Sequence, residues 1–431
     1  MFRAIYLFLI IFPFLVIPYD EYITVMKMGL LAYLSLSIWI LMFLKWYRQK
    51  MLPFEKKLYP PELFLIAFAV WAALSACLSN HPYIALFGMI KRHEGLLALY
   101  SYFTIFFITL RFAPIEKYKS LLTGLVSMSI IAGIYGVLQK FPLYFLLPDP
   151  GRVESFFENA NFFGSYLVIM LLTATVLMLL AKSRKEITLF ILIADLLFLN
   201  TLYTGTRSAL IGILAGVLFF SVFILKNSPN RLKRYIWLLF TFFIIFGIVN
   251  VMEGNVYLLR VFSIADSAKQ ALHNDGDAGS YRWKIWQLAL PLVGKYPLFG
   301  SGPDTLVYVF NQGAFRNFIH VKDALVDKAH NEYLQISITM GIPALLFYLG
   351  FLSTVLRSIW KAIWKSSGEK QLLLAGFFAI LIGYIVQAFF NISVVPVAPF
   401  FWFMLGMAYR LSYTETFTIE SHTHMSTIPL S

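Results

Sequence analysis

The chain has 431 residues, of which 59% are hydrophobic and 13% are charged, and its mean hydropathy is +0.74. A soluble globular chain is nearer half apolar and about a quarter charged, so this composition excludes an ordinary soluble domain. The apolar residues come in runs of about 20, the length at which a helix crosses the hydrocarbon core of a bilayer. The alternating pattern of a membrane barrel is absent, and the sequence therefore predicts an all-α, polytopic membrane bundle.

Hydropathy predicts about twelve transmembrane helices. The first is interpreted as a retained span, because no small-residue cleavage site follows it. Residues 1–412 are expected to form a single transmembrane domain, followed by a flexible cytoplasmic tail over 413–431. The expected spans are 4–18, 23–44, 61–78, 95–110, 121–139, 161–181, 187–203, 208–225, 235–252, 333–356, 371–391 and 394–409.

Basic residues recur in every second loop between these spans. The segments are KWYRQKMLPFEKK, RFAPIEKYK, KSRKE, KNSPNRLKR and RSIWKAIWKSSGEK. The positive-inside rule places these loops, and both termini, in the cytoplasm. Basic loops that face anionic lipid account for most of the net charge of +13, so no nucleic acid partner is needed.

The outer loops include a long one over residues 253–331. A loop of this length without structure of its own is uncommon unless it is functional. It contains SYRWKIWQLALPLV, in which tryptophan and leucine are mixed with arginine and lysine. This pattern fits an amphipathic helix on the membrane surface, and it fits equally a helix that packs on the bundle.

Charged side chains on the predicted outer side gather at the ends of spans. The positive-inside rule disfavours arginine there. A guanidinium forms paired, charge-assisted hydrogen bonds with phosphate and stays protonated, so several arginines at one surface suit a lipid diphosphate. A single arginine at a span end also serves as a headgroup anchor, which is the competing interpretation. These charged residues are Arg92 and Glu94, Arg152, Glu154 and Glu158, Arg207, Arg282, and His330 with Glu332.

Other single residues carry less information. Asp195 lies deep in the seventh span, where an acid is either functional or a satisfied structural residue. Cys77 is the only cysteine, so no intramolecular disulfide can form. There is no Asp-x-Asp cluster, and the histidines lack the spacing of metal ligands, so no metal and no cofactor are expected.

Four segments, in order, resemble the O-antigen ligase and O-antigen polymerase family of bacterial cell-surface polysaccharide enzymes. They cover the motif region 151–347, and they are GRVESFFENANFFGSYL (151–167), TGTRSALIGILAG (204–216), RWKIWQLALPLVGKYPLFGSGPDT (282–305) and DKAHNEYLQISITMGIPALLF (327–347). Gly341 follows His330 and Asn331 at the family's spacing. Ala344 departs from the Gly, Thr or Tyr that ligases often carry there, so ligase and polymerase both remain open.

The resemblance implies a membrane glycosyltransferase that works on the outer face of the bacterial cytoplasmic membrane. The donor would be a glycan on undecaprenyl diphosphate. The acceptor would be a sugar hydroxyl, on lipid A core for a ligase or on another lipid-linked repeat for a polymerase. The implied fold is an all-helical bundle related to other membrane glycosyltransferases with lipid-linked donors.

The hypothesis for the mechanism assigns roles to seven residues. Fixed cations can stabilise the charge that develops on a departing diphosphate. His330 would either remove the proton from the acceptor hydroxyl or bind phosphate as a cation. Direct attack on the anomeric carbon would invert its configuration. The catalytic candidates are His330, Arg207 and Arg282, and the substrate-binding candidates are Arg152, Asn161, Arg92 and Glu332, the last as a supporting or packing residue.

Three other functions compete with this one. A transporter places ionisable groups near the bilayer midplane on repeated halves, whereas only Asp195 lies deep here and the halves do not look alike. A lipid-linked peptidoglycan polymerase of the shape and division family would share the topology, but its motifs are not recognised. A non-catalytic component of a polysaccharide assembly complex is the third alternative.

Overall fold

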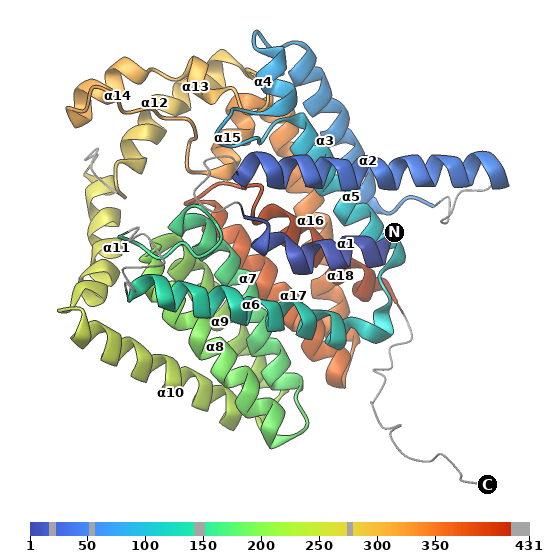
Figure 1. The fold of residues 1–431 in the computed structure, drawn as a ribbon, viewed down its shortest axis with the longest axis vertical. Coiled ribbons are helices and arrows are strands. Elements are labelled where there is room, and N and C mark those ends of the chain that lie inside the picture. The colour runs from blue at the N-terminus through green and yellow to red at the C-terminus, as the bar shows by residue number, and fades with distance from the viewer. Residues whose placement is uncertain (17–22, 51–56, 142–150, 274–278, 415–431) are drawn as a thin grey trace.

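The computed structural model describes residues 1–16, 23–50, 57–141, 151–273 and 279–414, and within these ranges it contains helices and no strand (Figure 1). The first half holds α1 (Phe2–Ile11), α2 (Ile23–Gln49), α3 (Pro60–Cys77), α4 (Pro82–Phe87), α5 (Leu96–Phe112), α6 (Tyr118–Lys140), α7 (Ala160–Leu180), α8 (Arg184–Thr204) and α9 (Arg207–Asn227). The second half holds α10 (Pro229–Met252), α11 (Val256–Leu272), α12 (Arg282–Lys295), α13 (Leu306–Val309), α14 (Gln312–Ile319), α15 (Glu332–Thr339), α16 (Gly341–Lys365), α17 (Gly368–Ala388) and α18 (Ala398–Tyr413).

The predicted all-α polytopic bundle is confirmed. Nine helices of the described chain are long and apolar enough to cross a membrane, namely α2, α3, α6, α7, α8, α9, α10, α16 and α17. The apolar stretches Phe2–Phe14 and Leu96–Phe112 are shorter. The count of twelve spans stays a prediction, and most of the predicted tail at 413–431 lies outside the described residues.

Helix α7 forms the centre of the bundle. Its sequence, ANFFGSYLVIMLLTATVLMLL, is apolar on all sides, and nearly every residue of the helix is buried. A helix that is hydrophobic all round is expected to be surrounded by other helices. Here α6, α8, α9 and α17 surround it (Figure 1).

The predicted cytoplasmic loops meet at one end of the bundle. The Arg111 guanidinium pairs with the Glu62 carboxylate, and Arg410 donates to the carbonyl oxygen of Leu110 at 2.9 Å. Lys182 lies 3.1 Å from Glu369. Similar contacts join the other basic loops at this end, through Lys119 with Glu186, Arg234 with the Ala181 carbonyl, and Lys370 with the Thr414 carbonyl.

The predicted continuous span 333–356 is wrong, because the structure breaks it into α15 and α16. Met340 leaves the helical conformation, and Gly341 has a φ of +89°. The last carbonyls of α15 instead accept hydrogen bonds from the 297–302 loop, with Ser301 N to Ile338 O at 3.1 Å and Gly302 N to Thr339 O at 2.8 Å. Helix ends need such partners for their free carbonyls.

The 253–331 loop is largely helical and holds α11 to α14; α12 to α14 lie at the upper left of the view and α11 lies below them (Figure 1, yellow to orange). It has a small apolar core of its own, around Ile285, Ala289 and Phe310. The helix predicted within 280–293 is confirmed as α12. Its Trp286 packs against Phe389 and Phe390 at the end of α17, so this helix does contact the bundle.

Candidate active site

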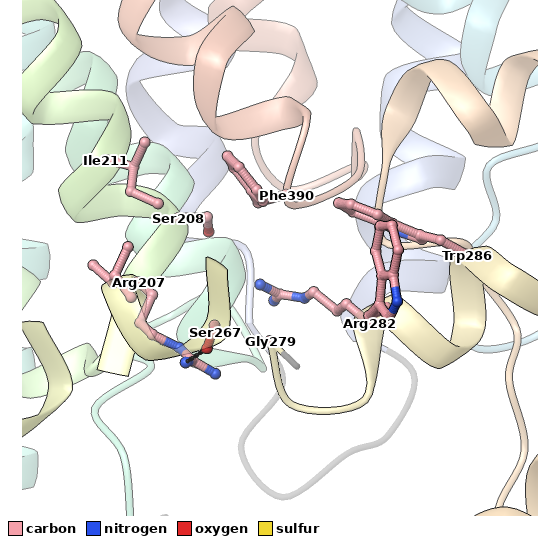
Figure 2. Close-up of a pocket in the computed structure, with 10 residues that line it drawn as sticks. Arg207, Ser208, Ile211, Ser267, Gly279, Arg282, Trp286 and Phe390 are labelled. Atoms are coloured by element: carbon pink, nitrogen blue, oxygen red, sulfur yellow. Dashed lines mark hydrogen bonds between the residues drawn. The ribbon is translucent and has the colours of Figure 1, made fainter. Parts of the chain in front are cut away.

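A pocket lies between the start of α9, helix α11, the start of α12 and the end of α17 (Figure 2). It encloses about 190 Å³, and we call it the arginine pocket. Two arginines face it, and none of the described residues that line it carries a carboxylate. Its residues are Arg207, Ser208, Ile211, Ile264, Ser267, Gly279, Arg282, Trp283, Trp286 and Phe390.

Arg207 is the first residue of α9, so it lies at the helix end where backbone N–H groups point outward. Its guanidinium donates to Ser267 Oγ at 2.9 Å and to Ser263 Oγ at 3.3 Å, which fastens it to α11. The Ser208 hydroxyl is buried and has no hydrogen-bond partner within the described part of the chain. A helix N-terminus with a cation and a free donor is suited to an anion.

Arg282 is the first residue of α12, and its guanidinium points into the pocket toward α9 (Figure 2). It forms no hydrogen bond or ion pair with any described residue. Burial, and then the positive charges of Arg207 and Arg152, lower the pKa of Arg282 to about 10. The side chain therefore stays charged at neutral pH, and its positive charge is not neutralised by the described residues.

Arg152 precedes α7 and is held by three acceptors from nearby elements. Its Nε donates to the Thr204 carbonyl at 2.7 Å, and its Nη2 donates to Thr206 Oγ1 at 3.0 Å and to Asn161 Oδ1 at 3.2 Å. Burial lowers the pKa of Arg152, and Arg260 and Arg207 lower it further. Arg152 and Asn161 thus lie together, next to the charged groups of the pocket.

Arg260 on α11 is a fourth arginine of this cluster, and it is not among the site residues predicted from the sequence. Its Nη1 donates to the Gly205 carbonyl at 2.9 Å. Gly205 has a φ of +57°, and a Cβ on it would lie 2.1 Å from the Arg260 guanidinium. The sequence did contain a signal, since Arg260 is another arginine on the predicted outer side.

His330 directly precedes the α15 cap and has a φ of +49°. The neighbouring Ala329 carbonyl accepts a hydrogen bond from Trp286 Nε1 at 2.9 Å, which joins the histidine loop to the wall of the arginine pocket. Burial and the positive charge of Arg282 lower the pKa of His330 to about 4, and the Asp327 carboxylate raises it by a smaller amount. At neutral pH the imidazole is therefore uncharged, and its buried Nδ1 has no partner among the described residues.

The other predicted site residues, Arg92 and Glu332, do not line the arginine pocket. Arg92 Nε lies 2.6 Å from Asp327 Oδ2, on the segment that leads to His330. Glu332 is 7% exposed, accepts from the Tyr348 hydroxyl at 2.6 Å, and does not line the arginine pocket. Asp195 accepts a hydrogen bond from Thr241 Oγ1 at 2.8 Å, which supplies the structural partner that the sequence left unknown.

Residues 192–349 match the family model described as O-antigen ligase. This part of the chain is therefore similar to the O-antigen ligase family. Three of the four resembling segments, at 204–216, 282–305 and 327–347, lie within the matched range, and 151–167 precedes it. Comparison with curated proteins gives no match.

Within the range similar to this family, Arg207, Arg282 and His330 come from segments that are far apart in sequence. The fold brings them to the end of the bundle opposite the cluster of basic loops. The described residues contain no group of three or more His, Cys, Asp or Glu side chains that could hold a metal ion. The positive charge available to an anion there is that of the arginines and of the α9 helix end.

The lowered pKa of His330 predicts a pH-dependent stability. The folded protein resists protonation of this imidazole, whereas the unfolded chain takes up the proton near pH 6.5. The free energy of unfolding should therefore fall as the pH drops from about 6.5 toward 4, and this loss should be smaller in His330→Gln. Thermal melting in detergent at pH 7 and pH 5 measures it, with the exposed His320→Gln as control. Equal losses for wild type and His330→Gln contradict the prediction.

Proposed function

We propose that the protein is a glycosyltransferase that transfers or polymerises glycan from undecaprenyl-diphosphate-linked donors on the outer face of the bacterial cytoplasmic membrane. The observation that carries this proposal is the arginine pocket, whose Arg282 points inward without a counter-charge among the described residues. Uncompensated buried cations are costly, so such a group suggests a missing anionic ligand. A diphosphate supplies the negative charge that Arg207 and Arg282 lack.

The pocket also suits the lipid part of such a donor. Apart from its arginines and serines, its lining is apolar, with Ile211, Ile264 and Phe390 next to the charged end. An isoprenoid chain can contact these residues while the diphosphate contacts the guanidinium groups. The opposite end of the bundle collects the basic loops, which supports placing the arginine pocket on the outer face.

The transfer step is proposed as a single displacement. The acceptor oxygen forms a bond with the anomeric carbon, the bond from that carbon to the diphosphate oxygen breaks, and the acceptor proton passes to His330. The arginines stabilise the charge on the leaving diphosphate, so the step needs no metal ion. The uncharged imidazole supports the role of proton acceptor over that of phosphate-binding cation in the unliganded site. Products of inverted configuration are expected, and retained configuration or loss of transfer in EDTA overturns this mechanism.

The first test is the length of the glycan on undecaprenyl diphosphate in host membranes, compared between wild type and His330→Ala. Single repeat units that accumulate in the variant identify a polymerase. Full-length chains that accumulate on the lipid identify a ligase whose final transfer has stopped. The exposed His320→Ala is the matched control, and it should leave the pool as in wild type.

An unchanged lipid-linked pool in His330→Ala overturns the enzymatic role of His330 and favours a non-catalytic component. The hydrogen bond between Asp195 and Thr241 argues against the transporter alternative, because it gives the deep carboxyl a structural role. Substrate-dependent uptake into liposomes by the purified protein is the result that would restore that alternative.

A further inference from the structure

A buried ion pair lies beneath the histidine loop, away from the arginine pocket. Lys328 Nζ is 2.5 Å from Asp304 Oδ1, and both residues are only 3% exposed. They line a small inner chamber of about 60 Å³ together with Glu94 and Glu332. The proposed mechanism uses neither member of this pair.

The Asp304 carboxylate also holds the loop that carries Arg92. Its Oδ2 accepts hydrogen bonds from Met89 N at 2.8 Å and from Glu94 N at 3.1 Å. Its Oδ1 pairs with Lys328, two residues before His330. One buried carboxylate thus joins residues 89–94 to the histidine loop, and the Arg92–Asp327 ion pair repeats this link nearer the surface.

The other two acids of the chamber have different hydrogen-bond partners, so Asp304 is the acid that pairs with Lys328. Glu94 accepts from the Tyr102 hydroxyl at 3.0 Å, and Glu332 accepts from the Tyr348 hydroxyl. Burial raises the pKa of Glu94 to about 8, so this carboxyl is largely protonated at neutral pH. Burial also raises the pKa of Glu332, to about 7, and among the described residues Lys328 forms its ion pair with Asp304.

Stability alone does not account for this pair. Taking two charges out of water costs free energy, and apolar side chains of similar volume often replace a buried ion pair without loss of stability. A charged pair instead fixes two segments in one register, because the alternative arrangements leave a charge unpaired in the interior.

We propose that Asp304 is a positioning residue, which through Lys328 and the 89–94 loop holds His330 near Arg282 for the transfer reaction. This inference rests on the proposed glycosyl transfer. Donor binding should depend little on Asp304. Arg207 is held by Ser267 on α11, and Trp286, which donates to the Ala329 carbonyl, is also held by its packing on Phe389 and Phe390. The inference therefore predicts an effect on turnover without an effect on the affinity for the lipid diphosphate.

The test is the double variant Asp304→Asn/Lys328→Met, which removes both charges together and leaves no single buried ion. Transfer should fall roughly 10²-fold in kcat, since small misplacements of catalytic groups have effects of that size. The Kd for undecaprenyl diphosphate should stay within about twofold of wild type, as expected for separate sites. Carbethoxylation of His330, followed by peptide mass spectrometry with His320 as internal reference, should become roughly tenfold faster as the loop opens.

The matched control is Glu62→Gln/Arg111→Met, which removes another buried ion pair at the opposite end of the bundle. It should leave the carbethoxylation rate of His330 and the kcat of the folded protein unchanged. If Asp304→Asn/Lys328→Met does not fold, Asp304→Glu keeps the charge and displaces it by one methylene, and the same three measurements apply.

Wild-type kcat in a folded Asp304 variant overturns the proposal, as does a lowered kcat with an unchanged carbethoxylation rate at His330. Failure of the proposed function is a separate result, in which the wild type itself transfers no glycan. Carbethoxylation does not depend on transfer, so it still decides in that case whether Asp304 positions His330.

Discussion

Arg282→Gln is expected to reduce glycan transfer by about 10²- to 10³-fold, the effect of losing one preorganised group that stabilises developing charge. Arg282 points into the arginine pocket and has no counter-charge among the described residues (Figure 2). Its positive charge is therefore available to a bound diphosphate. The affinity for undecaprenyl diphosphate, measured in detergent with the purified variant, should fall together with the transfer rate.

The stability of this variant gives a second readout. Arg282 is repelled by Arg207 and Arg152, so its removal should leave the melting temperature unchanged or raise it. Arg207→Gln differs, because it also breaks the hydrogen bonds to Ser263 and Ser267 on α11 and should lower the melting temperature.

Arg316→Gln is the matched control for Arg282→Gln. Arg316 lies on α14 in the same outer loop, donates to the Ala324 carbonyl at 2.7 Å, and does not line the pocket. Transfer and lipid diphosphate binding should be as in wild type. An Arg282→Gln protein that binds undecaprenyl diphosphate with wild-type affinity contradicts the assigned role of the pocket.

Much of the architecture followed from composition and hydropathy. Runs of apolar residues identify helices because a membrane span must satisfy its own backbone hydrogen bonds. The largely apolar 161–181 segment became the buried α7, whereas segments with mixed faces, such as α10, lie at the periphery. The broken helix at 333–356 could not be read from hydropathy, since both halves are apolar and the break depends on hydrogen bonds from the 297–302 loop.

The candidate site follows from the sequence only in part. Arg207 and Arg282 stood out because the positive-inside rule disfavours arginine on the predicted outer side, and both line one pocket. Arg260 was missed because α11 was not expected as a helix, and its proximity to Gly205 is a tertiary contact. The pairing of Asp304 with Lys328 is also tertiary, since the two residues lie on different loops and neither belongs to a local motif.

The second large effect is expected for Gly341→Ala, at the break between α15 and α16. A Cβ at Gly341 would lie 1.8 Å from the Leu298 carbonyl oxygen and 2.4 Å from its carbonyl carbon. The φ of +89° is also one that side-chain-bearing residues rarely adopt. The strained backbone at residue 341 and the displacement of the Leu298 backbone should together lower the free energy of unfolding by about 3 kcal/mol or more.

The displaced Leu298 belongs to the loop that satisfies the last carbonyls of α15, the helix that begins two residues after His330. Gly341→Ala should therefore reduce transfer even in the protein that remains folded. Gly247→Ala on α10 is the matched control, because a Cβ there meets no atom within 4 Å. It should leave transfer unchanged and melt at the wild-type temperature or slightly above, since alanine favours helix over glycine by roughly 0.5–1 kcal/mol. If the two variants melt at the same temperature, the close approach of Gly341 to Leu298 does not hold α15 in place, and the histidine loop must be positioned by its ion pairs alone.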